Sequence, residues 1–278
     1  MKNQLLVFFF VLLFVACDRE TPKPNDNNVV PTDTTQSEDP PSTADIIYDA
    51  VTDIDGNHYN AVRIGNQIWM ASNLRTTRFA NGEEIPTPTS GNDFFSSRFP
   101  RKYAPSNYIG YIPTYGYLDN WVAVMHNSVT SNENPSGVQG VCPDGWHVPS
   151  DAEWTQLTEY VGTQSDFICS NSTNIAKALA SNSNWSYNSI TPCAVGYNVS
   201  TNNATGFSAL PAGNAYQNNG ADWKEFGTDA NFWTSSGKRL YRNINCNAAD
   251  VRTYNFDPPA SEYAQTNTVA FSVRCVQD

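Results

Sequence analysis

Residues that could act as metal ligands or as acid–base catalysts are few in this sequence and lie far apart. The chain contains three histidines, His58, His126 and His147, and none follows the His-x-x-x-His spacing of a zinc site. We expect His147 to be a partly buried side chain bonded to the backbone. Candidate catalytic acids occur only as isolated groups in loop-like stretches: Glu83-Glu84, Asp222 with Glu225, and Asp257. No Cys-x-x-Cys pair, nucleophile motif or nucleotide-binding motif is present, so the sequence predicts no catalytic residue, no metal and no cofactor.

One stretch, Asp53-Ile54-Asp55-Gly56-Asn57, is similar to the opening of a calcium-binding loop. The glutamate that should close such a loop is missing. The Asp-Gly pair is also the most common chemistry of a hairpin turn. We therefore predict a turn between two strands here and no calcium site.

Residues 1–17 have the pattern of a bacterial lipoprotein signal. Lys2 precedes an apolar run over residues 5–15, which is too short to span a bilayer. Phe14-Val15-Ala16-Cys17 resembles a lipobox. This pattern predicts that Cys17 is acylated and attaches an exported protein to the outer membrane or cell surface. An ordinary signal peptide with an incidental cysteine is the alternative.

The next segment, residues 18–43, contains five prolines among Asn, Asp, Thr and Ser and has almost no apolar side chains. Such a segment cannot bury enough apolar surface to offset the entropy lost on ordering. We predict a disordered tether over residues 18–43. Because no repeat or second linker divides the remainder, residues 44–278 should form a single domain.

Five cysteines fall within this domain: Cys142, Cys169, Cys193, Cys246 and Cys275. In an exported protein they should form disulfides, and their odd number leaves one thiol unpaired in a monomer. Each of the five choices of unpaired residue allows three pairings, which the sequence does not separate. Short loop closure favours Cys169 with Cys193.

The periodicity of the domain is that of an α+β protein rich in loops, with short antiparallel strands and one or two helices. Alternating residues predict a three-stranded meander over 46–52, 58–64 and 67–70. Later short strands are predicted over 207–210, 230–236, 240–244, 251–256 and 269–276.

A capping box predicts the start of the main helix. Ser150 is followed three residues later by Glu153, so the helix should begin at Asp151. Gly162 is expected to end it. The helix face that should enter the core carries Trp154, Leu157 and Val161. A second, short helix is predicted over residues 174–181.

Aromatic residues gather in two loop-like regions. The first group is predicted to fill the interior rather than to form a sugar-stacking surface: Tyr103, Tyr108, Tyr111, Tyr115, Tyr117 and Trp121. The second group lies among Asn, Ser and Gly and is predicted to be exposed and to bind a ligand: Trp185, Tyr187, Tyr197, Tyr216 and Trp223.

Several sequence blocks carry a family resemblance: Val141–Trp154, Asp53–Tyr59, Ile64–Leu74, Thr205–Gly213, Phe232–Ser236 and Ser272–Val276. In this order they resemble the Fibrobacter succinogenes major paralogous domain (FISUMP) of surface and secreted proteins of Bacteroidetes and Fibrobacteres. The resemblance spans about residues 46–278. It implies a fold similar to C-type lectin-like and formylglycine-generating-enzyme domains, and a disulfide between Cys142 and Cys275, which leaves Cys246 over. The family has no settled activity.

Neither activity of those related folds is supported by the residues present. Cys275 has no close cysteine neighbour of the kind that formylglycine-generating enzymes use near the C-terminus. The Glu-Pro-Asn and Trp-Asn-Asp motifs of calcium-dependent lectins are also missing. The family resemblance therefore implies an architecture and leaves the activity open.

The composition narrows the class of partner. A formal charge of −11 disfavours nucleic acid, because binding it requires a positively charged surface. We therefore predict a non-enzymatic envelope lipoprotein that binds or adheres to a glycan or a protein. The alternatives are an extracellular hydrolase or modifying enzyme with an unrecognised site, and a structural envelope or fimbria-associated component.

Overall fold

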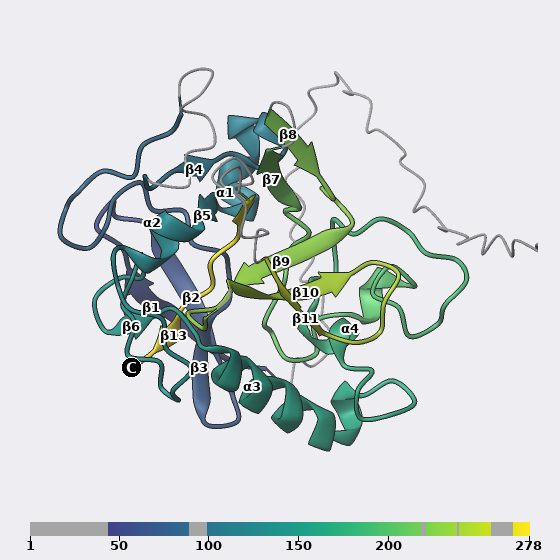
Figure 1. Ribbon diagram of the computed structural model, residues 1–278. Coiled ribbons are helices and arrows are strands. Elements are labelled where there is room, and N and C mark those ends of the chain that lie inside the picture. The colour runs from purple at the N-terminus through teal and green to yellow at the C-terminus, as the bar shows by residue number, and fades with distance from the viewer. Residues whose placement is uncertain (1–43, 89–98, 218–220, 238, 257–268) are drawn as a thin grey trace, which may run out of the picture.

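The computed structural model describes residues 44–88, 99–217, 221–237, 239–256 and 269–278 (Figure 1). The predicted signal at 1–17, the lipidation of Cys17, the tether at 18–43 and the candidate acid Asp257 lie outside the described residues. Within the described part, the chain is an α+β arrangement of short, mostly antiparallel strands and few helices. None of the helices described there is long and apolar enough to cross a membrane.

The first sheet begins with the meander expected from the sequence. It comprises β1 (Asp45–Thr52), β2 (His58–Ile64) and β3 (Gln67–Met70). The chain later returns to this sheet as β6 (Trp146–His147) and β13 (Val276–Gln277), which gives the strand order β1-β2-β3-β13-β6. Because Val276 pairs with Trp69 on one side and His147 on the other, the end of the chain holds the two halves of this sheet together.

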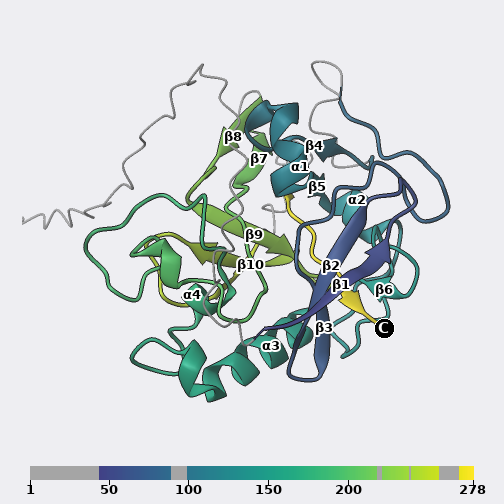
Figure 2. The same ribbon diagram turned by 180° about the vertical axis from the view of Figure 1, so that it is seen from behind.

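Two further sheets complete the described domain. One has the order β11-β10-β9 and contains β9 (Asp229–Trp233), β10 (Leu240–Asn245) and β11 (Arg252–Asn255). The other has the order β4-β5-β12-β7-β8 and contains β4 (Lys102–Tyr103), β5 (Leu118–Asn120), β7 (Asn214–Gln217), β8 (Ala221–Lys224) and β12 (Val269–Phe271). Figures 1 and 2 show this third sheet above the other two, on the side of the molecule away from the longest helix.

Two strand predictions are wrong. Residues 207–210 form no strand, because Ala209 makes only an isolated bridge to Ala180. The single strand expected over 269–276 is instead two strands, β12 and β13, which belong to different sheets. Strands β4, β7 and β8 were not predicted, because each is short; β4 and β7 also pair with segments distant along the chain, whereas β8 pairs with β7 in a hairpin.

Four α-helices are described: α1 (Ile112–Tyr115), α2 (Trp121–Met125), α3 (Asp151–Thr163) and α4 (Ala176–Leu179). Four 3₁₀ turns accompany them: η2 (Pro105–Asn107), η3 (Ile109–Tyr111), η4 (Ser165–Phe167) and η5 (Val199–Thr201). α4 lies within the stretch predicted for the second helix, and Leu179 is buried as expected.

The longest helix, α3, begins as predicted, with a complete capping box. The Glu153 amide donates to Ser150 Oγ over 3.1 Å, and the Ser150 amide donates to Glu153 Oε2 over 2.8 Å. The predicted end at Gly162 is wrong, since α3 continues through Thr163. A Cβ at position 162 would lie 2.5 Å from the Ser172 carbonyl oxygen. Gly162 therefore allows a close backbone approach instead of ending the helix.

The core of the domain is aromatic where α3 meets the meander and β9. Trp154 of α3 lies 4.8 Å from Trp69, 5.5 Å from Phe207 and 5.4 Å from Phe232, measured between ring centroids. Leu157 and Val161 are buried on the same helix face. The apolar stripe read from the sequence thus faces the core, as predicted.

Disulfides join segments that are distant along the chain. Cys142 is bonded to Cys275, which connects the turn before β6 to the residue before β13, and Cys169 is bonded to Cys193. These are the pair implied by the family resemblance and the pair favoured by short loop closure. Cys246, the cysteine that these two pairs leave over, is buried in the same core cluster as Trp154.

Candidate functional site

The five aromatic residues proposed as a ligand surface do not come together. Trp185 is only 7% exposed and belongs to the core, where its Nε1 donates to Ser181 Oγ over 3.1 Å. Tyr197 is half-buried, and its carbonyl oxygen accepts a hydrogen bond from Lys177 Nζ. Tyr187 alone of the five is largely exposed, at 68%. The prediction of an exposed aromatic surface is therefore wrong.

The two aromatics of the β7–β8 hairpin point to opposite faces. Trp223 pairs with Ala215, whereas the neighbouring Tyr216 pairs with Asp222. Since successive side chains of a strand alternate between faces, Trp223 packs into the core of the third sheet and Tyr216 packs on the other side. The rings are therefore separated by the hairpin itself.

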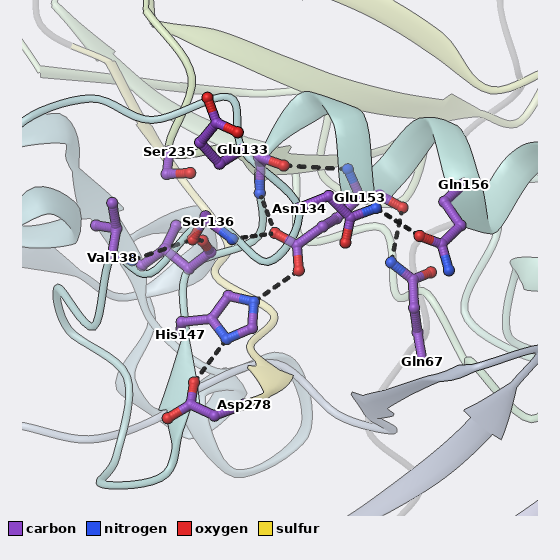
Figure 3. A network of polar contacts seen from close by, with 12 residues as sticks. Gln67, Glu133, Asn134, Ser136, Val138, His147, Glu153, Gln156, Ser235 and Asp278 are labelled. Carbon is purple, nitrogen blue, oxygen red and sulfur yellow. Dashed lines mark hydrogen bonds and ion pairs between the residues drawn. The ribbon is translucent and has the colours of Figure 1, made fainter.

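His147 lies in a buried polar network that the sequence did not predict (Figure 3). It is 1% exposed, and its partners are carboxylates rather than the backbone. Its Nε2 is 2.7 Å from Glu153 Oε1, and its Nδ1 is 2.7 Å from Asp278 Oδ1. Glu153 Oε2 accepts from the amides of Ser150 and Ser136, so one carboxylate both caps α3 and holds the imidazole.

This network is suited to holding charge and not to transferring protons. Burial by itself lowers the pKa of His147, but the hydrogen bonds and charges of Glu153 and Asp278 outweigh it, so the pKa lies above its ordinary value. Each ring nitrogen already faces a carboxylate oxygen. No ring nitrogen is left to take a proton from a ligand, and we assign the network a structural role.

A cleft of about 500 Å³ opens between the β1–β2 turn and helix α1. One wall is polar and the other is apolar and aromatic. The polar wall carries Asp55, Asn57, Arg75 and Thr77. The facing wall carries Ile112, Pro113 and Tyr117. Polar groups opposite an aromatic and apolar wall are typical of a ligand site.

The turn that forms the polar wall is held by Asp53. Its carboxylate accepts from the amides of Asp55 and Asn57, each over 2.9 Å, and from Asn57 Nδ2 over 2.8 Å. The buried Tyr59 hydroxyl donates to it over 2.6 Å. Burial, together with this hydrogen bond, raises the pKa of Tyr59. The residues similar to a calcium loop thus form the predicted hairpin turn.

Asp55 fixes the segment 75–78 against this turn. Its carboxylate accepts from Arg78 Nε over 2.6 Å, from the hydroxyls of Thr76 and Thr77 over 3.1 and 2.9 Å, and from the Thr77 amide. Burial alone would raise the pKa of Asp55, but these hydrogen bonds outweigh it and lower the pKa to about 2. Since the carboxylates of Asp53 and Asp55 both face N–H and O–H donors, this turn is not arranged to bind a cation.

Arg75 is positioned by neutral groups. Its Nε donates to Asn57 Oδ1 over 3.2 Å, and its Nη2 donates to the His58 carbonyl oxygen over 3.1 Å. The guanidinium lies 4.8 Å from the centre of the Tyr59 ring. No sequence pattern pointed to Arg75, because its position depends on the packing of the turn against the segment that follows the meander.

The opposite wall depends on a close approach at Gly116. Its φ is 73°, and a Cβ there would lie 2.5 Å from the Leu74 carbonyl oxygen. The Tyr117 amide donates to that same oxygen over 3.0 Å, which holds Tyr117 beside the segment that carries Arg75. Tyr117 was among the aromatics expected to fill the interior, and it is instead half-buried at the cleft.

A buried acid interacts with the lining residue Tyr117 but does not itself line the cleft. Asp119 of β5 pairs across the strands with Lys102 of β4. Burial raises the pKa of Asp119 to about 7, although the charge of Lys102 opposes this rise. Among the residues that line the cleft, Asp55 is the acidic one. The cleft therefore lacks the pair of convergent carboxylates that hydrolysis of a glycosidic bond requires.

The other candidate acids form no catalytic pair in the described chain. Asp222 makes an ion pair with Lys224 over 3.2 Å, whereas Glu225 accepts from the side chains of Asn214 and Asn231. Glu83 lies 3.3 Å from His126.

The fold and the cleft define a disulfide-bonded α+β domain of short antiparallel strands, with a polar cleft beside its first hairpin. Residues 62–277 match the model of the Fibrobacter succinogenes major domain, and the chain belongs to this family. No curated protein and no solved structure matches the chain.

Proposed function

We propose that this chain is an exported Bacteroidetes lipoprotein, anchored through Cys17, whose domain binds a glycan or a surface protein without catalysis. We also propose that the fold is C-type lectin-like, which the family resemblance implies. The disulfides Cys142–Cys275 and Cys169–Cys193 are consistent with an extracellular domain. No nucleic acid, metal or cofactor is required.

The observation that carries this proposal is the composition of the cleft. Asn57, Arg75 and Thr77 offer hydrogen bonds on one wall, and Pro113 and Tyr117 offer an apolar and aromatic surface on the other. Such a pairing suits sugar rings, which have hydroxyl edges and apolar faces. The carboxylate of Asp55 is engaged by internal donors, which favours binding over catalysis.

A lipid anchor lowers the affinity that the cleft needs. When many anchored copies engage one polymer or cell, individual contacts in the millimolar to micromolar range suffice, because later contacts form at a high local concentration. A shallow polar cleft is consistent with such affinities.

The binding proposal is tested with the full chain, purified in detergent and screened on immobilised glycans and matrix proteins with and without a chelator. We expect binding that is insensitive to the chelator and falls at least about tenfold in Tyr117→Ala. Tyr187→Ala is the matched control, because Tyr187 is exposed and outside the cleft. Binding lost in Tyr187→Ala but kept in Tyr117→Ala would place the site elsewhere.

Two further outcomes would contradict the proposal that the domain acts without catalysis and without a metal. Hydrolysis of any substrate in a parallel panel that disappears in Asp55→Asn would show an enzyme. Binding lost on chelation would show a metal requirement. The anchor is tested separately, since Cys17→Ser should abolish labelling by a radioactive fatty acid and release the protein from membranes; persisting label would refute it.

A further inference from the structure

Arg75 places a guanidinium in the cleft that makes no ion pair with a carboxylate of the described chain. Four other arginines each have a carboxylate partner: Arg63, Arg78, Arg242 and Arg252. Arg75 instead donates to an amide oxygen and a backbone carbonyl oxygen. The chain has a formal charge of −11, so an arginine that lines a cleft without a carboxylate partner is a feature that can select an acidic ligand.

The guanidinium keeps donors for a ligand. Arginine has five N–H donors, and two of those of Arg75 are used by Asn57 and His58, which leaves three. Its contacts with Asn57, His58 and the Tyr59 ring also fix its orientation. A fixed guanidinium binds a planar carboxylate through paired hydrogen bonds and loses little side-chain entropy in doing so.

The nearest acid of the cleft does not cancel this charge. Asp55 lines the same wall, but its oxygens accept from Arg78, Thr76 and Thr77. Asp55 and Arg78 form an internal ion pair of 2.6 Å, which balances the two charges against each other. The carboxylate of Asp53 does not line the cleft and accepts from Asp55, Asn57 and Tyr59, so Arg75 is left without a direct carboxylate contact among the described residues.

We propose that the cleft binds a sugar residue that bears a carboxylate, such as a uronic acid, and that Arg75 determines this specificity. The inference rests on the proposed binding function of the cleft. Arg75 supplies the charged donor, Asn57 and Thr77 supply neighbours for ring hydroxyls, and Tyr117 with Pro113 supplies the apolar wall. A neutral sugar would leave the guanidinium without an ionic partner, so the acidic sugar is preferred.

The test compares three trisaccharides by calorimetric titration of the full chain in detergent: trigalacturonate, its methyl ester and a neutral galactose trisaccharide. The expected result is that trigalacturonate binds at least about tenfold more tightly than either neutral probe, and that added salt weakens its binding. Arg75→Gln should remove that preference, and Arg75→Lys should retain part of it. Arg63→Gln is the matched control, since Arg63 is an exposed arginine outside the cleft.

The outcomes separate this inference from the binding proposal. If all three probes bind equally well and only Tyr117→Ala weakens them, the cleft binds glycans and the inference about Arg75 is wrong. If a sulfated galactose trisaccharide, titrated as a fourth probe, binds and trigalacturonate does not, the carboxylate assignment is wrong. If no saccharide binds to protein whose circular dichroism shows a folded domain, the inference and the glycan form of the proposed function both fail.

Discussion

Replacing Trp154 tests whether α3 organises the core. The Trp154 ring is completely buried between Trp69, Phe207 and Phe232. Truncation to alanine removes the buried ring and leaves a cavity among three other rings. Losses of this kind in protein cores cost about 3–5 kcal/mol. We expect Trp154→Ala to lower the free energy of unfolding by this amount.

A second substitution separates the ring from its polar atom. Trp154 Nε1 is buried without a hydrogen-bond partner in the described structure. A buried, unsatisfied donor costs about 1–3 kcal/mol. Trp154→Phe keeps most of the apolar contact and removes this donor. The stability lost with the smaller ring is therefore partly offset by removal of the unsatisfied N–H group. We expect Trp154→Phe to cost no more than about 2 kcal/mol.

Thermal melts followed by circular dichroism measure both effects. In a domain of this size each kcal/mol shifts the melting temperature by about 2–4 °C, so Trp154→Ala should lower it by about 10 °C. Glu159→Ala, on the exposed face of α3, is the control and should change it little. A shift of only a degree or two in Trp154→Ala, or an equal loss in Trp154→Phe, would refute the assigned helix face or the role of the unsatisfied donor.

Three further predictions follow from other parts of the domain. Peptide mapping without reduction should recover Cys142 linked to Cys275, and a Cys142 peptide linked elsewhere would reject the pairing. The double substitution Cys142→Ser with Cys275→Ser should lower the free energy of unfolding by about 4–5 kcal/mol, because the loop that the disulfide closes is long. The pKa of His147 is raised in the folded state, so the protonated imidazole stabilises the fold fully below its unfolded pKa of about 6.5, and this stabilisation is lost as the pH rises through the folded pKa. The difference in unfolding free energy between the natural chain and His147→Gln should therefore shrink with rising pH. An unchanged difference would show that the imidazole does not titrate in this range. Arg274 is fully buried and donates to Asn73 Oδ1 and to three backbone carbonyl oxygens. Lysine cannot reach all of these acceptors from one position, so Arg274→Lys should lower the free energy of unfolding by about 2–4 kcal/mol in a denaturant melt. A loss below about 1 kcal/mol would mean that the acceptors find other donors.

The local elements were predictable because their signals lie within a few residues of one another. Alternating apolar residues and an Asp-Gly turn set the meander, and the three-residue spacing of Ser150 and Glu153 set the start of α3. The same reasoning failed at Gly162, where the glycine serves a contact with Ser172 ten residues later. A glycine pattern cannot distinguish a helix end from a close backbone approach.

The candidate site was predicted only in part. The turn over residues 53–57 was expected, but its role as one wall of a cleft was not. Arg75 and Tyr117 are 42 positions apart, and the backbone around Leu74 and Gly116 brings them together. Trp185, expected at the surface, lies in the core because burial of its large ring is favourable and Ser181 Oγ accepts from its indole N–H.

Local signals were enough to predict the family, the meander, the capped start of α3 and the cysteines available for disulfides. Three features depend on the folded chain: β12 and β13 enter different sheets, Glu153 serves both the helix cap and His147, and Arg75 lines a cleft without a carboxylate partner among the described residues. The difference lies in the distance along the chain over which each interaction acts. Periodicity and capping act over a few residues, whereas strand pairing, burial and charge compensation depend on contacts between segments more than a hundred residues apart, such as that between Val276 and Trp69.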